Sequence, residues 1–235
     1  MMYFNKLNAA ILFLLIVFSA CTSNEIGESK DVAQDKIYQQ YSISYTEGNE
    51  KLSVYAQFRF AGKNGTTLVL TKPSQVVFDD EIIKVDSSNV SGAYYQIQKA
   101  VAGFYNKHHF IFTDINNKKF DNDFSFDAFK LVSLPPAVSK KQSFNLLFET
   151  TALQPGDYIE VTTNNTDSSF SVTHEAKDGG NFIIIPAKEL QRQKGNELSI
   201  EATLYRNIPL QQNTAEGGEL EIKYALKAVT IRLND

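Results

Sequence analysis

The feature that most constrains the fold is a two-residue alternation of apolar and polar side chains. It is clearest in KLSVYAQFRF, from Lys51 to Phe60, where apolar residues take every second position from Leu52 onward. Successive side chains of a β-strand point to opposite faces, so this spacing places one apolar face and one largely polar face on an extended segment. The segment is therefore predicted to be a half-buried strand.

A similar strand-like pattern recurs along most of the chain, and turn residues such as Asn116-Asn117 and Gly179-Gly180 separate the predicted strands. Phenylalanine (17 residues) and tyrosine (11 residues) are abundant, and both suit a pleated, half-buried surface. The only helical signal is PAKELQRQ at 186–193. We therefore predict an all-β protein. The further strand-like runs are 66–71, 75–78, 82–86, 94–98, 108–114, 144–150, 158–163, 170–174, 181–185, 197–206 and 219–233.

A pair of prolines marks the expected domain boundary, in Leu134-Pro135-Pro136-Ala137. Proline lacks a backbone donor and favours an extended spacer. Each side of this boundary has close to the ~100 residues and ~7 strands of an immunoglobulin-like sandwich. We expect two tandem immunoglobulin-like β-sandwich domains, at 37–134 and 137–235.

The chain opens with an apolar run from Ala9 to Ala20, preceded by Lys6. The run is shorter than the roughly 20 apolar residues that cross a bilayer, and it has the length of a signal-peptide core. Ser19 and Ala20 are small residues that lead into Cys21, the single cysteine of the chain. A single cysteine allows no intramolecular disulfide.

This arrangement resembles the lipobox of bacterial lipoproteins. The resemblance implies cleavage between Ala20 and Cys21, which makes residues 1–20 the signal peptide. It also implies a diacylglycerol on the Cys21 sulfur and usually an N-acyl chain. Each buried CH₂ contributes about 0.8 kcal/mol, so two or three chains anchor a protein stably. The alternative is an ordinary signal peptide, but Phe18 is then bulky where that peptidase requires a small residue.

The segment that follows, 21–36, is expected to be a lipidated cysteine and an acidic linker. Its sequence from residue 22, TSNEIGESKDVAQDK, has no apolar periodicity. As a flexible coil it would span on the order of 20 Å. Acidic residues behind the cysteine resemble those of surface-exported lipoproteins of Bacteroidetes-type bacteria. Thr22 stands where an inner-membrane retention signal has aspartate, which favours the outer membrane, facing the periplasm or the cell surface.

A second resemblance covers about residues 66–124. The stretches LVLTKPSQVVFDDEIIKV, AYYQIQ and HHFIFTDINNKKFDND are similar to a recurring pattern in uncharacterised Bacteroidetes lipoproteins. The resemblance implies an immunoglobulin-like domain and brings no catalytic residue with it.

Acidic and histidine side chains are the candidate metal ligands of the chain. His108 and His109 are neighbours on a predicted strand, so they point to opposite faces and cannot chelate one ion, and His174 is distant in sequence. The density of oxygen ligands around one hairpin would suit Ca²⁺, although it lacks the glycine and closing glutamate of an EF-hand loop. Asp and Asn are also the ordinary residues of turns. This weak calcium candidate comprises Asp114, Asn116, Asn117, Asp121 and Asp123.

Tyr94, Tyr95 and Tyr105 bracket a small-residue stretch and form the candidate ligand platform. Aromatic rings so placed stack on sugars or seat a protein partner, whereas the alternative is that they fill the core. The chain has no tryptophan, the residue on which sugar rings usually stack, and this argues against a carbohydrate ligand.

The sequence offers no motif for nucleophilic catalysis, since no Gly-x-Ser-x-Gly occurs. The net charge of −4 argues against a nucleic-acid partner. We therefore expect a non-enzymatic envelope lipoprotein, without cofactor, held on the membrane by its lipid and bound to a protein partner. The alternatives are a surface glycan-binding lipoprotein of an outer-membrane uptake system and a hydrolase whose paired carboxylates are distant in sequence.

Overall fold

A computed structural model describes residues 25–88, 90–165, 171–177 and 179–235. These residues form nineteen strands, two 3₁₀ turns (Ser29–Asp31 and Gln34–Lys36) and one short helix, α2 (Ala187–Leu190), so the all-β prediction is confirmed. The strands are β1 (Ile26–Glu28), β2 (Ile37–Thr46), β3 (Lys51–Phe60), β4 (Thr66–Val69), β5 (Gln75–Phe78), β6 (Glu81–Ile82), β7 (Val85–Ser88), β8 (Gly92–Ala100), β9 (Lys107–Thr113), β10 (Lys119–Ser125), β11 (Lys130–Ser133), β12 (Ala137–Ser139), β13 (Phe144–Glu149), β14 (Tyr158–Asn165), β15 (Ser171–Lys177), β16 (Phe182–Ile185), β17 (Glu197–Ile208), β18 (Gly218–Ala225) and β19 (Val229–Asn234).

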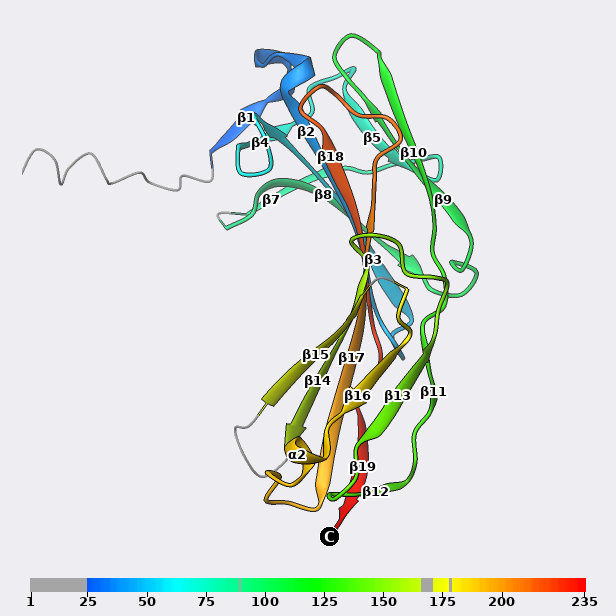
Figure 1. Cartoon of the computed structure of the whole chain (residues 1–235). Coiled ribbons are helices and arrows are strands. Elements are labelled where there is room, and N and C mark those ends of the chain that lie inside the picture. The colour runs from blue at the N-terminus through cyan, green and yellow to red at the C-terminus, as the bar shows by residue number, and fades with distance from the viewer. Residues whose placement is uncertain (1–24, 89, 166–170, 178) are drawn as a thin grey trace, which may run out of the picture.

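The strands build two sandwiches, one above the other in Figure 1. In the upper sandwich, a sheet made of β1, β4, β3, β2 and β18 with β7 and β8 faces the four-stranded sheet β10-β9-β5-β6. In the lower sandwich, β19, β17, β14, β15 and β12 face the three-stranded sheet β11-β13-β16. Rings interlock between the upper sheets: Tyr41 of β2 stacks on Phe110 of β9 with centroids 4.5 Å apart.

One twelve-stranded sheet runs through both sandwiches. In the lower sandwich, β17 pairs with β14 along Leu198–Tyr205, and its last residues pair with β18. β18 in turn lies parallel to β2, in register from Gly218 opposite Gln39 to Ala225 opposite Thr46 (Figure 1). A side chain at Gly218 is excluded, because its Cβ would lie 2.4 Å from the Gln39 carbonyl oxygen.

This pairing corrects the expected division into 37–134 and 137–235. The two prolines do lie between β11 and β12, but residues 218–225 of the second half form a strand of the upper sandwich. The run expected as one strand over 219–233 is two strands, β18 and β19, separated at 226–228. Hydrophobic residues of both sandwiches belong to one continuous buried cluster.

The linker expected over 22–36 is wrong for residues 25–36. Ile26–Glu28 form β1, which lies parallel to β4 with Ile26 opposite Thr67. Ser29 is fully buried, and its Oγ accepts a hydrogen bond from the Thr71 amide at 2.9 Å. The polar side chains suggested a linker, but β-pairing uses backbone groups and depends little on side-chain polarity.

The expected signal peptide, Ala20 and Cys21 lie outside the described residues. Within the described residues, no helix has the length and apolar character needed to cross a membrane.

Three core tyrosines give the fold a defined response to alkaline pH. Burial raises the pKa of Tyr95 to about 12, and burial also raises the pKa values of Tyr41 and Tyr224. A folded-state pKa above the ordinary value of about 10 favours folding below pH 10, and this contribution is lost as pH rises toward 12.

We therefore expect the free energy of unfolding to fall as pH rises above about 10. Tyrosinate absorbance measures this directly, since the chain has 11 tyrosines and no tryptophan. The folded protein should show an early group of exposed tyrosines and a late group that titrates with unfolding. Replacing Tyr95 by Phe should reduce the absorbance change of the late group by the contribution of one tyrosine. A single transition of all tyrosines near pH 10, with the fold intact, would contradict this assignment.

Candidate functional site

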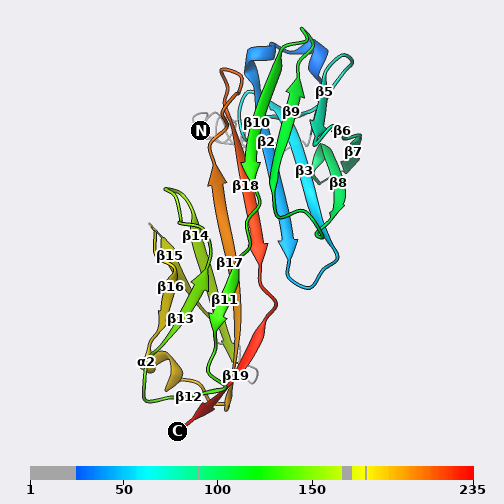
Figure 2. The same ribbon diagram turned by 90° about the vertical axis from the view of Figure 1, so that its right-hand side faces the viewer.

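A groove of about 380 Å³ opens at the waist between the two sandwiches. Figure 2 shows the setting: β11 lies at the edge of the three-stranded sheet, beside β17 and the chain that links β18 to β19. The groove is lined by Glu47, Lys130, Leu131, Leu134, Ile200, Ala202, Leu226, Lys227 and Val229.

The walls of the groove are aliphatic. Leu131 and Leu134 are half-buried on one side, and Ile200 and Ala202 of β17 are buried on the other. Leu226 is also buried, although it lies in the break between β18 and β19. Pockets of about 300–1,000 Å³ with mostly apolar walls are typical of binding sites.

Charged residues border these walls. Glu47, Lys130 and Lys227 are all exposed, and Glu47 Oε2 accepts a hydrogen bond from the Lys227 backbone amide at 3.0 Å. In the part of the chain that the structure describes, the ammonium groups of Lys130 and Lys227 form no ion pair. The rim therefore carries two lysines without an ion pair and one glutamate, a net charge of +1.

The edge of β11 facing the groove is open. Among the described residues, β13 is the only strand that pairs with β11. The Phe148 amide of β13 donates to Asn181 at 2.8 Å, so the backbone of Phe148 is directed away from β11. Antiparallel pairs alternate between hydrogen-bonded and non-hydrogen-bonded, and Leu131 stands opposite Phe148. The amide and carbonyl of Leu131 therefore point to the free edge.

An apolar stripe covers the outer face of the same three-stranded sheet. Its side chains are Val132 (52% exposed), Leu147 (41%), Phe182 (51%) and Ile184 (50%). Leu147 and Phe182 stand opposite one another across β13 and β16. Single exposed apolar residues are ordinary, but a cluster on one small sheet is typical of an interaction surface.

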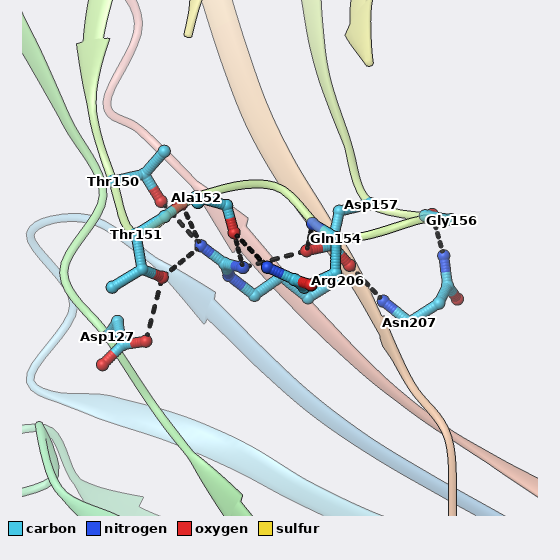
Figure 3. A network of polar contacts seen from close by, with 9 residues as sticks. All are labelled: Asp127, Thr150, Thr151, Ala152, Gln154, Gly156, Asp157, Arg206 and Asn207. Carbon is cyan, nitrogen blue, oxygen red and sulfur yellow. Dashed lines mark hydrogen bonds and ion pairs between the residues drawn. The ribbon is translucent and has the colours of Figure 1, made fainter. Parts of the chain in front are cut away.

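A buried ion pair holds this region in place (Figure 3). Arg206 of β17 donates through Nη1 to Asp157 at 2.9 Å, and both side chains are at least nine-tenths buried. Its Nη2 donates to Thr150 Oγ1 at 2.9 Å and to Thr151 Oγ1 at 2.6 Å. Asp157 Oδ1 accepts the Asn207 amide at 3.0 Å.

This network reaches β11 as well. Thr151 Oγ1 donates to Asp127 Oδ2 at 3.1 Å, just ahead of Lys130, where β11 begins. Arg206 thus fixes the end of β13 and the entry to β11 against β17. The geometry of the groove depends on this contact, although Arg206 does not line it.

The structure does not bring the three platform tyrosines together. Tyr94 and Tyr95 are neighbours on β8, so they lie on opposite faces. Tyr94 is half-buried and stacks on Tyr55, whereas Tyr95 is in the core and its hydroxyl accepts the Leu70 amide at 2.6 Å. Tyr105 is 46% exposed and contacts the Tyr224 hydroxyl at 3.0 Å. The candidate platform is therefore not assembled.

The calcium candidates serve the β9–β10 hairpin. Asp114 is buried, and its Oδ1 accepts the amides of Asn116 and Lys118, both at 2.8 Å. Asp121 and Asp123 lie farther along β10, where their amides donate to side chains of the chain after β17. Within the described residues, no three His, Cys, Asp or Glu side chains gather as a metal site.

The histidines also have protein partners. His108 is buried between Asp79, 2.6 Å from its Nδ1, and the Phe104 carbonyl oxygen, 2.7 Å from its Nε2. His109, its neighbour, is half-buried on the opposite face of β9. His174 lies 2.8 Å from Glu189, which is buried and also accepts from Thr163.

Sequence reasoning missed the groove and the stripe. The groove joins segments near residues 131, 200 and 227, which only the fold brings together. The stripe did leave a signal, because Phe182–Ile185 is continuously apolar and Leu146-Leu147 breaks the alternation. A strand with apolar residues on both faces has a second face to cover.

Neither a protein-family model nor a curated protein matches the sequence. Among solved structures, the chain is similar to a tetra-tandem repeat in the extending region of a large adhesion protein, with 10% identity and a TM-score of 0.24. This match covers 82% of this chain and 49% of that one. The chain is also similar to trypsin-activated alpha-2-macroglobulin from Escherichia coli, with 10% identity, a TM-score of 0.22 and coverage of 81% and 15%. This chain thus spans about half of the first protein and less of the second.

Replacing Arg206 by Ala should destabilise the protein by about 3 kcal/mol, because it leaves the Asp157 carboxylate buried without its charged partner. Denaturant unfolding measures the loss. The control is Arg232→Ala, an exposed cation of β19, for which we expect a change of about 0.5 kcal/mol or less. Equal effects of the two substitutions would show that the Arg206 network is not a principal support of the waist.

Proposed function

We propose that this chain is a lipid-anchored envelope protein that binds a protein partner through its lower sandwich, without catalysing a reaction. The observation that carries the proposal is the combination of the apolar groove with the exposed stripe around β11. Buried interface cores are depleted in charge and rich in apolar side chains, as these surfaces are.

The position of β1 supports the anchored arrangement. Only three residues separate Cys21 from Glu25, where the described chain begins, so these four Cα-to-Cα steps span at most about 14 Å. A lipid on Cys21 would hold the upper sandwich close to the membrane. The lower sandwich extends away from the β1 end of the molecule (Figure 1), so its groove would face the surrounding compartment. The proposed location is the outer membrane.

The other two functions receive no specific support. A glycan platform would need the tyrosine side chains that the fold separates. A hydrolase would need convergent carboxylates; Asp35 and Asp114 line one hollow, but Asp114 Oδ1 already accepts two backbone amides.

The anchor is tested by Cys21→Ser. We expect the wild-type protein to stay with the membrane fraction through an alkaline wash and the variant to be released, because the sulfur that carries the lipid is gone. Mass spectrometry of the amino-terminal peptide provides an independent measurement. A variant that still withstands the wash, or a wild-type peptide without lipid mass, would end the anchoring proposal.

The partner is tested by photo-crosslinking in envelope membranes, with the crosslinker placed at Phe182 or at Val132. Both positions belong to the stripe, so we expect them to capture the same protein, identified by mass spectrometry. The control position is Lys84, exposed between β6 and β7 in the upper sandwich. The proposal fails if both stripe positions yield only uncrosslinked monomer, or if Lys84 captures the same set of proteins as the stripe.

A further inference from the structure

We propose that the partner enters the groove as an extended strand that pairs with the free edge of β11, and that its side chains alternate between apolar and acidic. The inference rests on the proposed function and names the chemistry of the bound segment. The added strand would become the fourth strand of the sheet β11-β13-β16.

The first support is the backbone of Leu131. Its amide and carbonyl point to the open side of β11, as the register with Phe148 requires. An unpaired strand edge is a template for another strand, which would lie about 4.8 Å away. A residue opposite Leu131 would exchange both backbone hydrogen bonds with it. This is the manner in which peptides add to sheet edges in other proteins.

The second support is the apolar wall beneath that position. A strand beside β11 would turn every second side chain inward, toward Ile200, Ala202 and Val229. These residues belong to β17 and β19, in the sheet that faces β11. Apolar side chains on the added strand would therefore cover the half-buried side chains of Leu131, Leu134 and Val229, next to the buried Ile200 and Ala202.

The third support is charge. The alternate side chains of the added strand would face outward, near the rim, where Lys130 and Lys227 have no ion pair in the described part of the chain. Carboxylates at these positions would meet both ammonium groups. A second copy of β11 would instead bring another Lys130 to the same rim, so charge favours an acidic partner over self-association.

The irregularity of β11 limits the length of the bound segment. The register between β11 and β13 shifts between Leu131 and Ser133, which is a β-bulge. A bulge bends its strand and ends regular pairing, and bulges are common beside binding sites. The strand contact is therefore short, and much of the affinity must come from side chains in the groove and on the rim.

The probe is a fluorescent peptide of about seven residues in which valine alternates with glutamate, long enough for one strand. The matched control has the same sequence with its central amides N-methylated, which removes backbone donors and keeps every side chain. We expect the probe to bind the full chain with a Kd below about 1 mM and the control to bind at least about tenfold more weakly. No binding of the probe at about 1 mM would overturn the inference.

Amide hydrogen exchange locates the contact. Exchange at Leu131 should slow at least about tenfold on binding, whereas exchange at Phe148, already paired with Asn181, should not change. Binding that leaves Leu131 unprotected would overturn strand addition. Protection of Leu131 on raising the protein concentration, without peptide, would overturn it in favour of a second copy of the chain.

Charge reversal tests the chemistry of the segment. The double variant Lys130→Glu, Lys227→Glu should no longer bind the valine–glutamate probe. It should instead bind a peptide in which valine alternates with lysine. Both lysines are exposed, so the fold should be retained. Equal binding of the two peptides by wild type would overturn the acidic assignment. If crosslinking at Phe182 and Val132 succeeds while these tests fail, the protein-partner proposal stands and only strand addition falls.

Discussion

The parallel pairing of β18 with β2 is the contact on which the rest of the architecture depends. It inserts a strand from near the end of the sequence into the sandwich formed by its beginning, and β17 continues the same sheet into the other sandwich. The two sandwiches also share one buried hydrophobic cluster, in which Phe129 contacts both Phe148 and Tyr224. The pairing joins β17 to the upper sandwich, and the Arg206 network holds the entry to β11 against β17.

The waist combines this continuous sheet with a polar support. A buried guanidinium is costly to desolvate, and Arg206 offsets that cost with a carboxylate, two hydroxyls and two carbonyl oxygens. Replacing both charges by apolar residues would recover desolvation energy but lose the directional hydrogen bonds, which hold both ends of the β13–β14 loop, at residues 150–152 and at Asp157. The main contribution of this cluster is therefore to fix the position of the β13–β14 loop against β17, more than to raise the net stability.

Local alternation was sufficient to predict most strands, as at Lys51–Phe60, because the period of side-chain direction is a property of a single strand. It also separates Tyr94 from Tyr95, which the platform hypothesis did not take into account. The packing of β1 and the placement of β18 were beyond such reasoning. Both depend on pairing with strands more than thirty residues away in the sequence. The side-chain pattern of a strand does not specify which other strand it pairs with.

The attachment of β1 has a mechanical consequence. A pull applied at residue 25 acts along the axis of β1, so the three residue pairs with β4 are loaded together in shear. So short a strand would yield before the ten-residue β2, which the chain reaches at Ile37. Its release would free residues 26–28, about 10 Å of extended chain, while the buried Ser29 stays bonded to the Thr71 amide and the rest of the upper sandwich stays intact. Under the proposed anchoring at Cys21, β1 would thus be the first element to detach under tension, before the body of the protein unfolds.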